Sequence, residues 1–388
     1  MIRLLHTADV HLGARHADLG EQAAAQRERQ FAAFRRSVDL AIEERVDLFL
    51  VAGDLFDSNT QPRRSVERVA AELHRLVQAT IRSVIIPGTH DVYDRSSIYR
   101  AYDLAALAGA PAGGDMVVVL TPDRPDVVLP ALDAVVYGRV FDTKRAPRSP
   151  LAGFDVHGET RATWRIGMIH GALSIPGRTD GDDVVFEAGE IAASGLDYLA
   201  LGHWHSMLSA RAGGVPYAYS GAPEPVAVDQ DRAGNVLLVT LDLVDGARTA
   251  TVQERIVGRT RFERLDVDAA EVPSQATLIA RLLTHAHPDL VLDVRLTGVR
   301  PDQLDLDLDE VEPALAPSFS RIRVRDLSAP GLAIGPVPPA ETIAGAFIRD
   351  VEARISELEA AGSADAAREM LDVLRLGRLL MSGQEVTL

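Results

Sequence analysis

The chain has 388 residues, of which 47% are hydrophobic and 25% are charged, a composition typical of a globular protein with one large domain and one or two smaller ones. It contains no cysteine, which excludes disulfides and thiolate metal sites, so any metal must be bound by histidine and carboxylate side chains. The net charge of −16 argues against a surface that binds nucleic acid all over, but it does not exclude a local basic groove.

Neither a membrane helix nor a secretion signal is predicted. The apolar runs stay short of the roughly 18 residues that a membrane helix needs. The chain opens with a strand-like segment, without the basic and apolar regions of a signal peptide. We therefore expect a cytoplasmic protein, although the absence of cysteine is also compatible with an oxidising compartment.

The first hundred residues predict a regular alternation of strands and helices. Runs of β-branched and other apolar residues at 2–9, 47–52 and 83–87 indicate buried strands. Apolar residues at helical spacing predict helices over 23–44 and 62–78 between them. Such a β-α-β-α-β succession implies parallel strands joined by right-handed crossovers.

The middle of the chain predicts a second group of strands. They are expected over 116–120, 132–137, 164–169, 198–201, 216–219, 236–243 and 249–257. Helices are expected over 97–107 and 187–194, and the proline, glycine and charge of 141–158 indicate a surface loop. The last strands follow one another as in hairpins, so this half is expected to be antiparallel or mixed. A layered α/β sandwich of two sheets fits better than one doubly wound sheet.

A change of character near residue 260 marks the expected end of the large domain, 1–260. A small α/β domain is expected over 261–327, and the prolines and glycines of 328–339 indicate a linker. The remaining residues, 340–388, predict two helices with a turn at Gly362. The first helix has an apolar stripe at helical spacing, made up of Ile343, Phe347, Val351, Ile355 and Leu358.

Histidines and aspartates follow several of the predicted strands. They are Asp9, His11, Asp54, Asp57, His90, Asp91, His170, His203 and His205. The carboxyl ends of parallel strands meet at one edge of a sheet, so these side chains are expected to lie together. Taken singly, each motif is weak, because Asp-x-His arises by chance and Gly-Asp-x-x-Asp is more often a turn or a cap. Taken together, they supply the nitrogen and oxygen ligands that hold two divalent ions about 3.5–4 Å apart.

The motifs in this order resemble those of the calcineurin-like metallophosphoesterase superfamily. Residues 7–13 (TADVHLG), 53–57 (GDLFD) and 202–205 (GHWH) are similar to the SbcD branch of DNA repair exonuclease subunits, which includes shorter YhaO-like proteins. The motifs span 9–205, and the later parts match the family's layout only in size and order. The resemblance implies an α/β/β/α sandwich with an α/β cap domain and a helical tail. It also implies a metal-dependent phosphodiesterase, the DNA exo/endonuclease subunit of an SbcCD-like repair complex.

The resemblance implies six metal ligands. One divalent ion would be bound by Asp9, His11 and His205. The other would be bound by His170 and His203. Asp54 would bridge the two ions, which are usually manganese in the family, with magnesium, iron or zinc as alternatives. A hydroxide held between the ions would attack the phosphodiester.

The loop with Thr89, His90 and Asp91 carries the expected catalytic acid and the one departure from the family's pattern. His90 would protonate or stabilise the leaving oxygen, with Asp91 to orient its imidazole and Asp57 to support the loop. Otherwise His90 is a seventh ligand or a structural histidine. The family normally has an asparagine, a ligand of the second ion, where this chain has Thr89. A water could replace the amide oxygen, the second ion could bind more weakly, or the site could be inactive; the first two are favoured because the other ligands are present.

Four residues are expected to contact the substrate. They are Arg63, Arg64, Tyr93 and Arg139. Arg63 and Arg64 begin a helix just past the second motif, where they could bind a phosphate backbone. Arg139 precedes a loop that also contains Lys144, Arg145 and Arg148. The ordinary alternatives are a solvated loop and, for Tyr93, a ring that only closes its loop.

DNA and a coiled-coil ATPase are the partners that the resemblance implies. In the family, helices beyond the cap dock on an SMC-like ATPase of the SbcC type, and the stripe at 343–358 suits such docking. The alternative is that this stripe packs on the second helix or on the cap, and a homodimer is left open. Two other functions are compatible with the sequence: a phosphatase or small-molecule phosphodiesterase, and a weakly active or inactive regulatory subunit disabled at Thr89.

Overall fold

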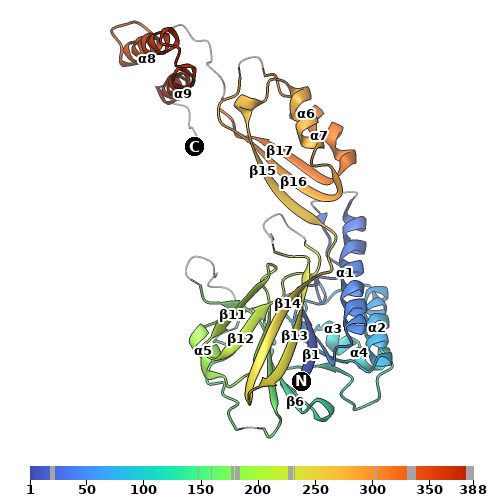
Figure 1. The fold of residues 1–388 in the computed structure, drawn as a ribbon. Helices are drawn as coiled ribbons and strands as arrows, with labels where there is room; N and C mark the ends of the chain where they lie inside the picture. The colour runs from blue at the N-terminus through green and yellow to red at the C-terminus, as the bar shows by residue number, and fades with distance from the viewer. Residues whose placement is uncertain are drawn as a thin grey trace. The chain divides into compact units, whose positions relative to one another are not determined.

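The computed structural model describes residues 1–17, 22–146, 148–158, 160–175, 179, 184–225, 230, 232–301, 304–329 and 338–381. The chain forms two compact units, Met1–Thr260 and Arg261–Leu388 (Figure 1). Most of the expected linker (330–337) and the end of the expected tail (382–388) lie outside the described residues. The division of the chain into a catalytic domain, a cap and a helical tail stays a prediction.

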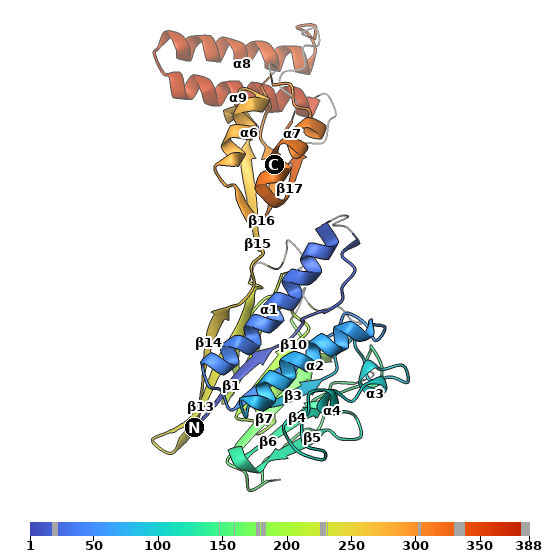
Figure 2. The same ribbon diagram turned by 90° about the vertical axis from the view of Figure 1, so that its right-hand side faces the viewer.

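The first unit contains a six-stranded sheet in the order β14-β13-β1-β2-β3-β4. Its strands are β1 (Ile2–Thr7), β2 (Leu48–Ala52), β3 (Arg82–Ile86), β4 (Val117–Val119), β13 (Asn235–Val244) and β14 (Ala247–Ile256). β1 to β4 run parallel, as expected, and β13 joins antiparallel to β1. Helices α1 (Ala23–Glu43) and α2 (Arg63–Gln78) cover one face of this sheet (Figure 2). Phe34 of α1 and Leu73 of α2 pack there in one cluster with Phe49 of β2.

A second six-stranded sheet of the same unit has the order β11-β12-β10-β7-β6-β5. Its strands are β5 (Asp126–Leu129), β6 (Ala134–Arg139), β7 (Trp164–His170), β10 (Tyr198–Gly202), β11 (Leu208–Ala212) and β12 (Val215–Tyr219). Its centre is parallel and its outer strands, β11 and β5, are antiparallel, which confirms the expected mixed sheet. Helix α5 (Ala188–Ala193) packs on it through Ile191. A two-stranded sheet of β8 (Ala172–Leu173) and β9 (Val185–Phe186) follows β7.

The two sheets pack on each other around an apolar core. Successive residues of a strand point to opposite faces, so Leu4 of β1 lies in this core while Leu5 lies under the helices. Val136 of β6, Met168 of β7 and Ala200 of β10 come from the second sheet. The expected layered α/β sandwich is therefore confirmed.

The expected helix over 97–107 is wrong. Two short helices stand there, α3 (Ile98–Ala101) and α4 (Leu104–Leu107). Ser97 caps the first and Asp103 caps the second, and Tyr102 between them has an extended backbone, so the helix is interrupted. The sequence also did not predict β5 and β11, two short strands at the rims of the second sheet.

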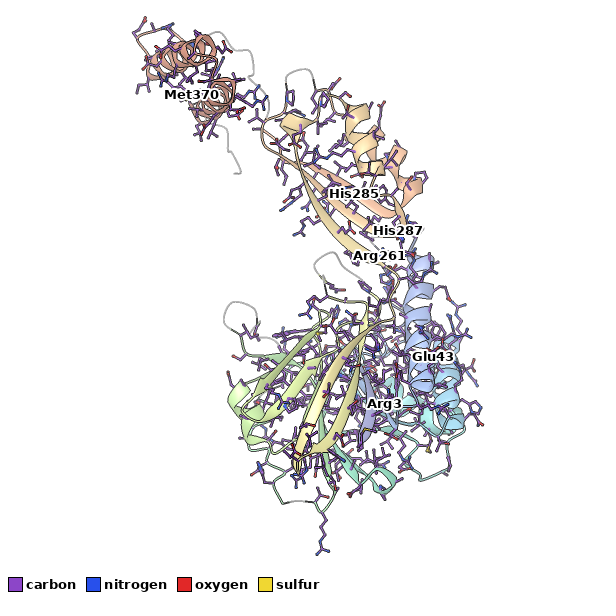
Figure 3. The ribbon with its side chains drawn as sticks, in the orientation of Figure 1. Arg3, Glu43, Arg261, His285, His287 and Met370 are labelled. Atoms are coloured by element: carbon purple, nitrogen blue, oxygen red, sulfur yellow. The ribbon has the colours of Figure 1, made fainter. Side chains whose placement is uncertain are left out.

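The second unit contains a parallel sheet in the order β15-β16-β17. Its elements are β15 (Arg261–Asp268), α6 (Gln275–Leu283), β16 (His287–Thr297), α7 (Leu308–Leu315) and β17 (Phe319–Asp326). Leu278 of α6 and Val311 of α7 pack in one cluster with Val294 of β16. His285 and His287 lie where the chain passes from α6 into β16 (Figure 3). The helix α7 was not expected from the sequence.

Two further helices, α8 (Ile343–Ala360) and α9 (Ala364–Met381), pack on each other. Their common core contains Val351 of the expected stripe together with Ile348 and Leu374. Ile343, the first residue of α8, lies outside this core and is 88% exposed, so it does not share in the packing on the second helix. Of the helices that the structure describes, none combines the length and the apolar character of a membrane span.

Candidate metal centre

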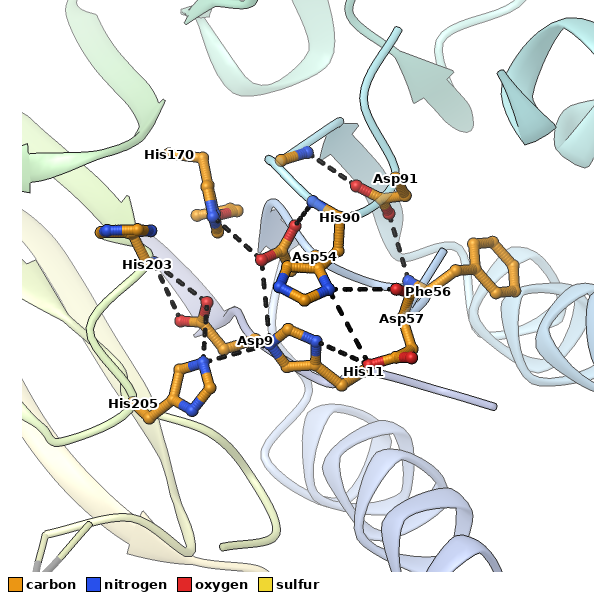
Figure 4. A network of polar contacts seen from close by, with 12 residues as sticks. Asp9, His11, Asp54, Phe56, Asp57, His90, Asp91, His170, His203 and His205 are labelled. Carbon is orange, nitrogen blue, oxygen red and sulfur yellow. Dashed lines mark hydrogen bonds and ion pairs between the residues drawn. The ribbon is translucent and has the colours of Figure 1, made fainter. Parts of the chain in front are cut away.

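The carboxyl ends of five strands meet in the first unit. The loops after β1, β2 and β3 come from the first sheet, and those after β7 and β10 from the second. Figure 4 shows that these ends bring together all the expected motif residues, namely Asp9, His11, Asp54, Asp57, His90, Asp91, His170, His203 and His205. Backbone hydrogen bonds join the first two loops, from Asp9 N to Gly53 O (3.1 Å) and from His11 N to Asp54 O (2.9 Å).

Three glycines allow these loops to approach so closely. A Cβ atom on Gly53 would lie 2.2 Å from His170 Nδ1, and one on Gly88 would lie 2.3 Å from Asp54 Oδ1. A Cβ atom on Gly202 would lie 2.0 Å from the carbonyl oxygen of Ala52. These three glycines are therefore required by the close approach of the loops, at Gly53 and Gly88 to a histidine or aspartate side chain and at Gly202 to the backbone of β2.

Left-handed backbone conformations also gather here. Asp9, His11, Asp54 and His203 have φ values of 53°, 48°, 50° and 105°. Such conformations are strained in residues with a Cβ atom, and they persist where the surrounding structure enforces them, most often at functional sites. The strain supports a functional role for this edge of the sandwich.

Overlapping groups of side chains could each hold a metal ion, because their ligand atoms lie within 4.8 Å of one another. Among the described residues these groups are Asp9 with His11 and His205, Asp9 with Asp54 and His170, and His11 with Asp57 and His90. In the first group, the Nε2 atoms of His11 and His205 lie 3.1 Å apart. Asp54 Oδ2 lies 3.1 Å from His170 Nε2 and 3.7 Å from His11 Nε2. Asp54 Oδ2 thus lies between His11 of the first group and His170 of the second group.

The environment of His170 fits a bound cation. Its Nδ1 atom lies 3.0 Å from the carbonyl oxygen of Ala52 and donates a hydrogen bond to it. Its Nε2 atom is buried, faces Asp54 and has no hydrogen bond of normal geometry to any described residue. Two buried polar atoms in this position need a proton or a cation between them.

The charges of the metal-free centre follow from burial and from the neighbouring side chains. Burial raises the pKa of Asp9 to about 6, although His170 and His11 oppose the rise. Burial alone would raise the pKa of Asp54 too, but the charges of His170 and His11 hold it well below its usual range. Burial alone would lower the pKa of His170, but Asp54 and Asp9 raise it to about 10. For His205, burial and the nearby His11 lower the pKa to about 3.

His203 lies beside these groups and belongs to none of them. Its backbone N–H donates to both carboxylate oxygens of Asp9, at 3.0 and 3.1 Å. Its ring stands edge-on to that of His170, with centroids 5.4 Å apart. The structure therefore places the ring of His203 next to that of His170, and its role as a ligand stays a prediction.

The expectation that Asp91 orients His90 is wrong. His90 Nδ1 lies 3.0 Å from the backbone carbonyl oxygen of Asp57, which fixes its imidazole instead. Asp91 is fully buried and accepts hydrogen bonds from Phe56 N (3.1 Å), Gly88 N (2.7 Å) and Tyr99 Oη (2.5 Å). Asp91 therefore holds two loops together behind the centre. The sequence could not show this, because Tyr99 carries no motif.

Comparison with known proteins identifies the family. Residues 2–207 match the model of the calcineurin-like phosphoesterases. The chain belongs to this family. The expected resemblance is confirmed, and the dinuclear metal centre of the family has candidate ligands in the groups described above.

Two of the residues that complete the surroundings of this centre were missed from the sequence. Tyr99 lies behind Asp91, and the side-chain nitrogen of Gln230 lies 2.5 Å from His205 Nδ1.

Three relatives illustrate the similarity to other phosphoesterases. The DNA double-strand break repair protein Mre11 of Aeropyrum pernix is 30% identical over 282 residues, 70% of this chain and 64% of that protein. The uncharacterized metallophosphoesterase YhaO of Bacillus subtilis is 28% identical over 238 residues, 56% of this chain and 52% of that protein. Mre11 of Halobacterium salinarum is 23% identical over 401 residues, 95% of this chain and 97% of that protein. The first two alignments thus cover half to two thirds of the relatives' length.

A solved structure, that of TT1561 of Thermus thermophilus, matches 66% of this chain and 99% of its own, with 13% identity and a TM-score of 0.42. A dimetal phosphatase from Danio rerio matches 65% of this chain and 98% of its own, with 11% identity and a TM-score of 0.37.

The expected substrate residues of this phosphoesterase lie outside the groups of candidate ligands. Arg63 is ion-paired with Glu67 (2.8 Å) on the exposed start of α2, next to the exposed Arg64. The guanidinium of Arg100 lies over the ring of Tyr93, 4.1 Å from its centroid. The guanidinium of Arg139 lies 4.0 Å from the centroid of the Phe154 ring. Their contact with substrate stays a prediction.

Proposed function

We propose that this chain is a two-metal phosphodiesterase that hydrolyses DNA as the nuclease subunit of an SbcCD-like repair complex. The observation that carries the proposal is the position of Asp54. Its Oδ2 atom faces His170 on one side and His11 on the other, at 3.1 and 3.7 Å, as a carboxylate that bridges two ions would. Its lowered pKa keeps it ionised for this task.

The side chains divide between holding the ions and serving the reaction. Asp9, His11 and His205 would bind one ion, and His170 and His203 the other, with Asp54 between them. Divalent ions there, manganese by expectation with magnesium, iron or zinc as alternatives, would activate water and neutralise charge on the phosphate.

His90 is the proposed general acid. Its Nδ1 atom is engaged by the carbonyl oxygen of Asp57, so Nε2 is the atom that would give a proton to the leaving oxygen. Its side chain is 49% exposed, which leaves it accessible to a substrate. Asp91 supports this reaction from behind, through the backbone of Gly88 and Phe56.

DNA is proposed as the substrate because the relatives named Mre11 are DNA double-strand break repair proteins. The net charge of −16 suits a subunit that gains much of its DNA affinity from a partner. That partner would be an SMC-like coiled-coil ATPase of the SbcC type, docked on α8 and α9. Exposed apolar residues of these helices support such docking: Ile343, Val373 and Leu380. The complex is expected in the cytoplasm, and a homodimer is left open.

The proposal is tested by incubating the protein with linear DNA and Mn²⁺. We expect metal-dependent degradation, its loss on addition of a chelator, and its loss in His90→Ala. His74→Ala is the matched control, because His74 is exposed on α2 and its Nδ1 atom lies 2.9 Å from the backbone carbonyl oxygen of Ala108. Hydrolysis of a phosphate monoester without any diester cleavage would contradict the nuclease and favour a phosphatase.

Thr89 favours a second candidate, a weakly active or inactive regulatory subunit. It is half-buried in the loop between Gly88 and His90. At this position the resemblance to the family implies an asparagine ligand. If the wild-type protein shows no metal-dependent cleavage and Thr89→Asn creates it, this second candidate replaces the first.

A further inference from the structure

Tyr219, the last residue of β12, contacts two loops of the centre. One loop carries His170, and the other carries His203 and His205. Tyr219 is fully buried. Its hydroxyl donates a hydrogen bond to Gly171 O (2.9 Å) and accepts one from Leu173 N (2.8 Å). Gly171 directly follows His170 in the chain. The hydroxyl of Tyr219 therefore fixes the backbone immediately after His170, a candidate metal ligand.

The ring of Tyr219 contacts the other histidine loop. It stacks on Trp204, with centroids 4.5 Å apart and planes at 19°. Trp204 is the residue between His203 and His205. The strand pairing that sets Tyr219 opposite Leu201 places the ring beside the end of β10, where this loop begins.

The residues after Tyr219 hold the same loop through its backbone. Ala222 N donates to the carbonyl oxygen of His205 (2.9 Å). A Cβ atom on Gly221 would lie only 2.6 Å from that oxygen. The short segment Tyr219–Ala222 is thus packed against the loops of His170, His203 and His205 together.

We propose that Tyr219 is a positioning residue of the metal centre, one that sets the separation between His170 and the pair His203 and His205. This assignment rests on the proposed function, since it takes the three histidines as metal ligands. A phenylalanine would fill the same space, but Gly171 O and Leu173 N would lose their partner and the backbone after His170 would relax. Residues that orient metal ligands in this way typically change metal affinity about 10–100-fold when they are replaced.

Tyr219→Phe and Trp204→Leu separate the two contacts in the full-length protein. The first removes the hydroxyl and keeps the ring, and the second removes the stack and keeps the hydroxyl. Tyr217→Phe is the matched control. Tyr217 lies two residues earlier on the same strand and in the same apolar cluster, and its hydroxyl has no hydrogen bond to a described residue. Mn²⁺ binding is measured by electron paramagnetic resonance, Co²⁺ coordination by visible absorption, and folding by thermal unfolding without metal.

We expect Tyr219→Phe to bind one Mn²⁺ like the wild type and the other about 10–100-fold more weakly, with a changed Co²⁺ spectrum for that ion. Trp204→Leu should change the same spectrum, and Tyr217→Phe should leave it unchanged. A purely structural role would lower the unfolding temperature and leave the Co²⁺ spectrum intact, which would overturn the assignment. If the wild type binds two ions and Tyr219→Phe binds them equally well, this assignment alone fails. If the wild type binds no divalent ion, both the proposed metal centre and the assignment of Tyr219 fail.

Discussion

The candidate metal centre has a buried half and a half that is open to solvent, and the two halves differ in their proposed roles. Asp9, Asp54 and His170 are 1%, 2% and 5% exposed, whereas the side chain of His90 is 49% exposed. In the buried half each charge needs an opposite charge beside it, because little water is present to stabilise it. In the open half the imidazole of His90 lies against the carbonyl oxygen of Asp57 and edge-on to the ring of His11, and the rest of it is open to solvent. The difference predicts that the buried half determines metal binding and the open half determines the rate of the reaction.

The largest effect is expected from Asp54→Asn in the buried half. The change removes the negative charge that faces His170 and His11, and with it the proposed bridge between the ions. We expect loss of one ion or both and a fall in activity of about 10³-fold or more, since metal catalysis supplies several kcal/mol. Metal content by mass spectrometry and DNA cleavage measure the two effects.

Asp47→Asn is the control for Asp54→Asn. Asp47 immediately precedes β2, at the end opposite to the loop of Asp54, and accepts a hydrogen bond from Arg3 N (2.8 Å). This variant should keep its metal content. An Asp54→Asn protein that retains two tightly bound ions would contradict the proposed bridge.

The next effect is expected from His90→Gln in the open half. Loss of the proposed acid should lower kcat about 10²–10⁴-fold, because that is what a positioned acid or base contributes. Metal content should stay at the wild-type value. If the variant instead loses an ion, His90 is a ligand of the group with His11 and Asp57, and the division between the halves is wrong.

A change of pH tests the buried half without mutation. In the metal-free protein the pKa of His170 is about 10, so the imidazole carries a proton near neutral pH. A metal ion needs the neutral ring. It also needs neutral His11, whose pKa burial would lower but Asp57 and Asp54 raise. Binding must therefore release at least one proton, and affinity should rise at least about tenfold per pH unit up to about pH 10. Below about pH 6 Asp9 also takes up a proton in the metal-free protein, which weakens binding further. Calorimetry in buffers of different ionisation enthalpy measures the release, and a heat that is independent of the buffer would refute it.

The smallest effect is expected from Thr89→Asn. An amide oxygen is a better ligand than a threonine hydroxyl, so the second ion should bind more tightly. The gain in affinity should be less than about tenfold if a water already occupies the position that the amide oxygen would take. Thr89→Val, which keeps the shape and removes the oxygen, is the control and should leave the affinity unchanged. A loss of affinity in Thr89→Val would show that the hydroxyl itself is a ligand.

The sequence predicted the buried half of the centre better than the supports around it. β1, β2 and β3 were predictable because their apolar runs are buried throughout, and each is followed directly by its motif residues. β11 was missed because its five residues, LSARA, include no β-branched or aromatic residue. The partners of Asp91 and the stack of Trp204 on Tyr219 were not predictable, since they join residues whose proximity depends on the finished fold.

The most direct test of the account is anomalous X-ray diffraction from a crystal of the protein soaked in Mn²⁺. The account predicts two peaks. One should lie among Asp9, His11 and His205, the other among His170, His203 and Asp54, with a carboxylate oxygen of Asp54 in contact with both. A single peak among His11, Asp57 and His90, or no peak at this edge of the sandwich, would contradict it.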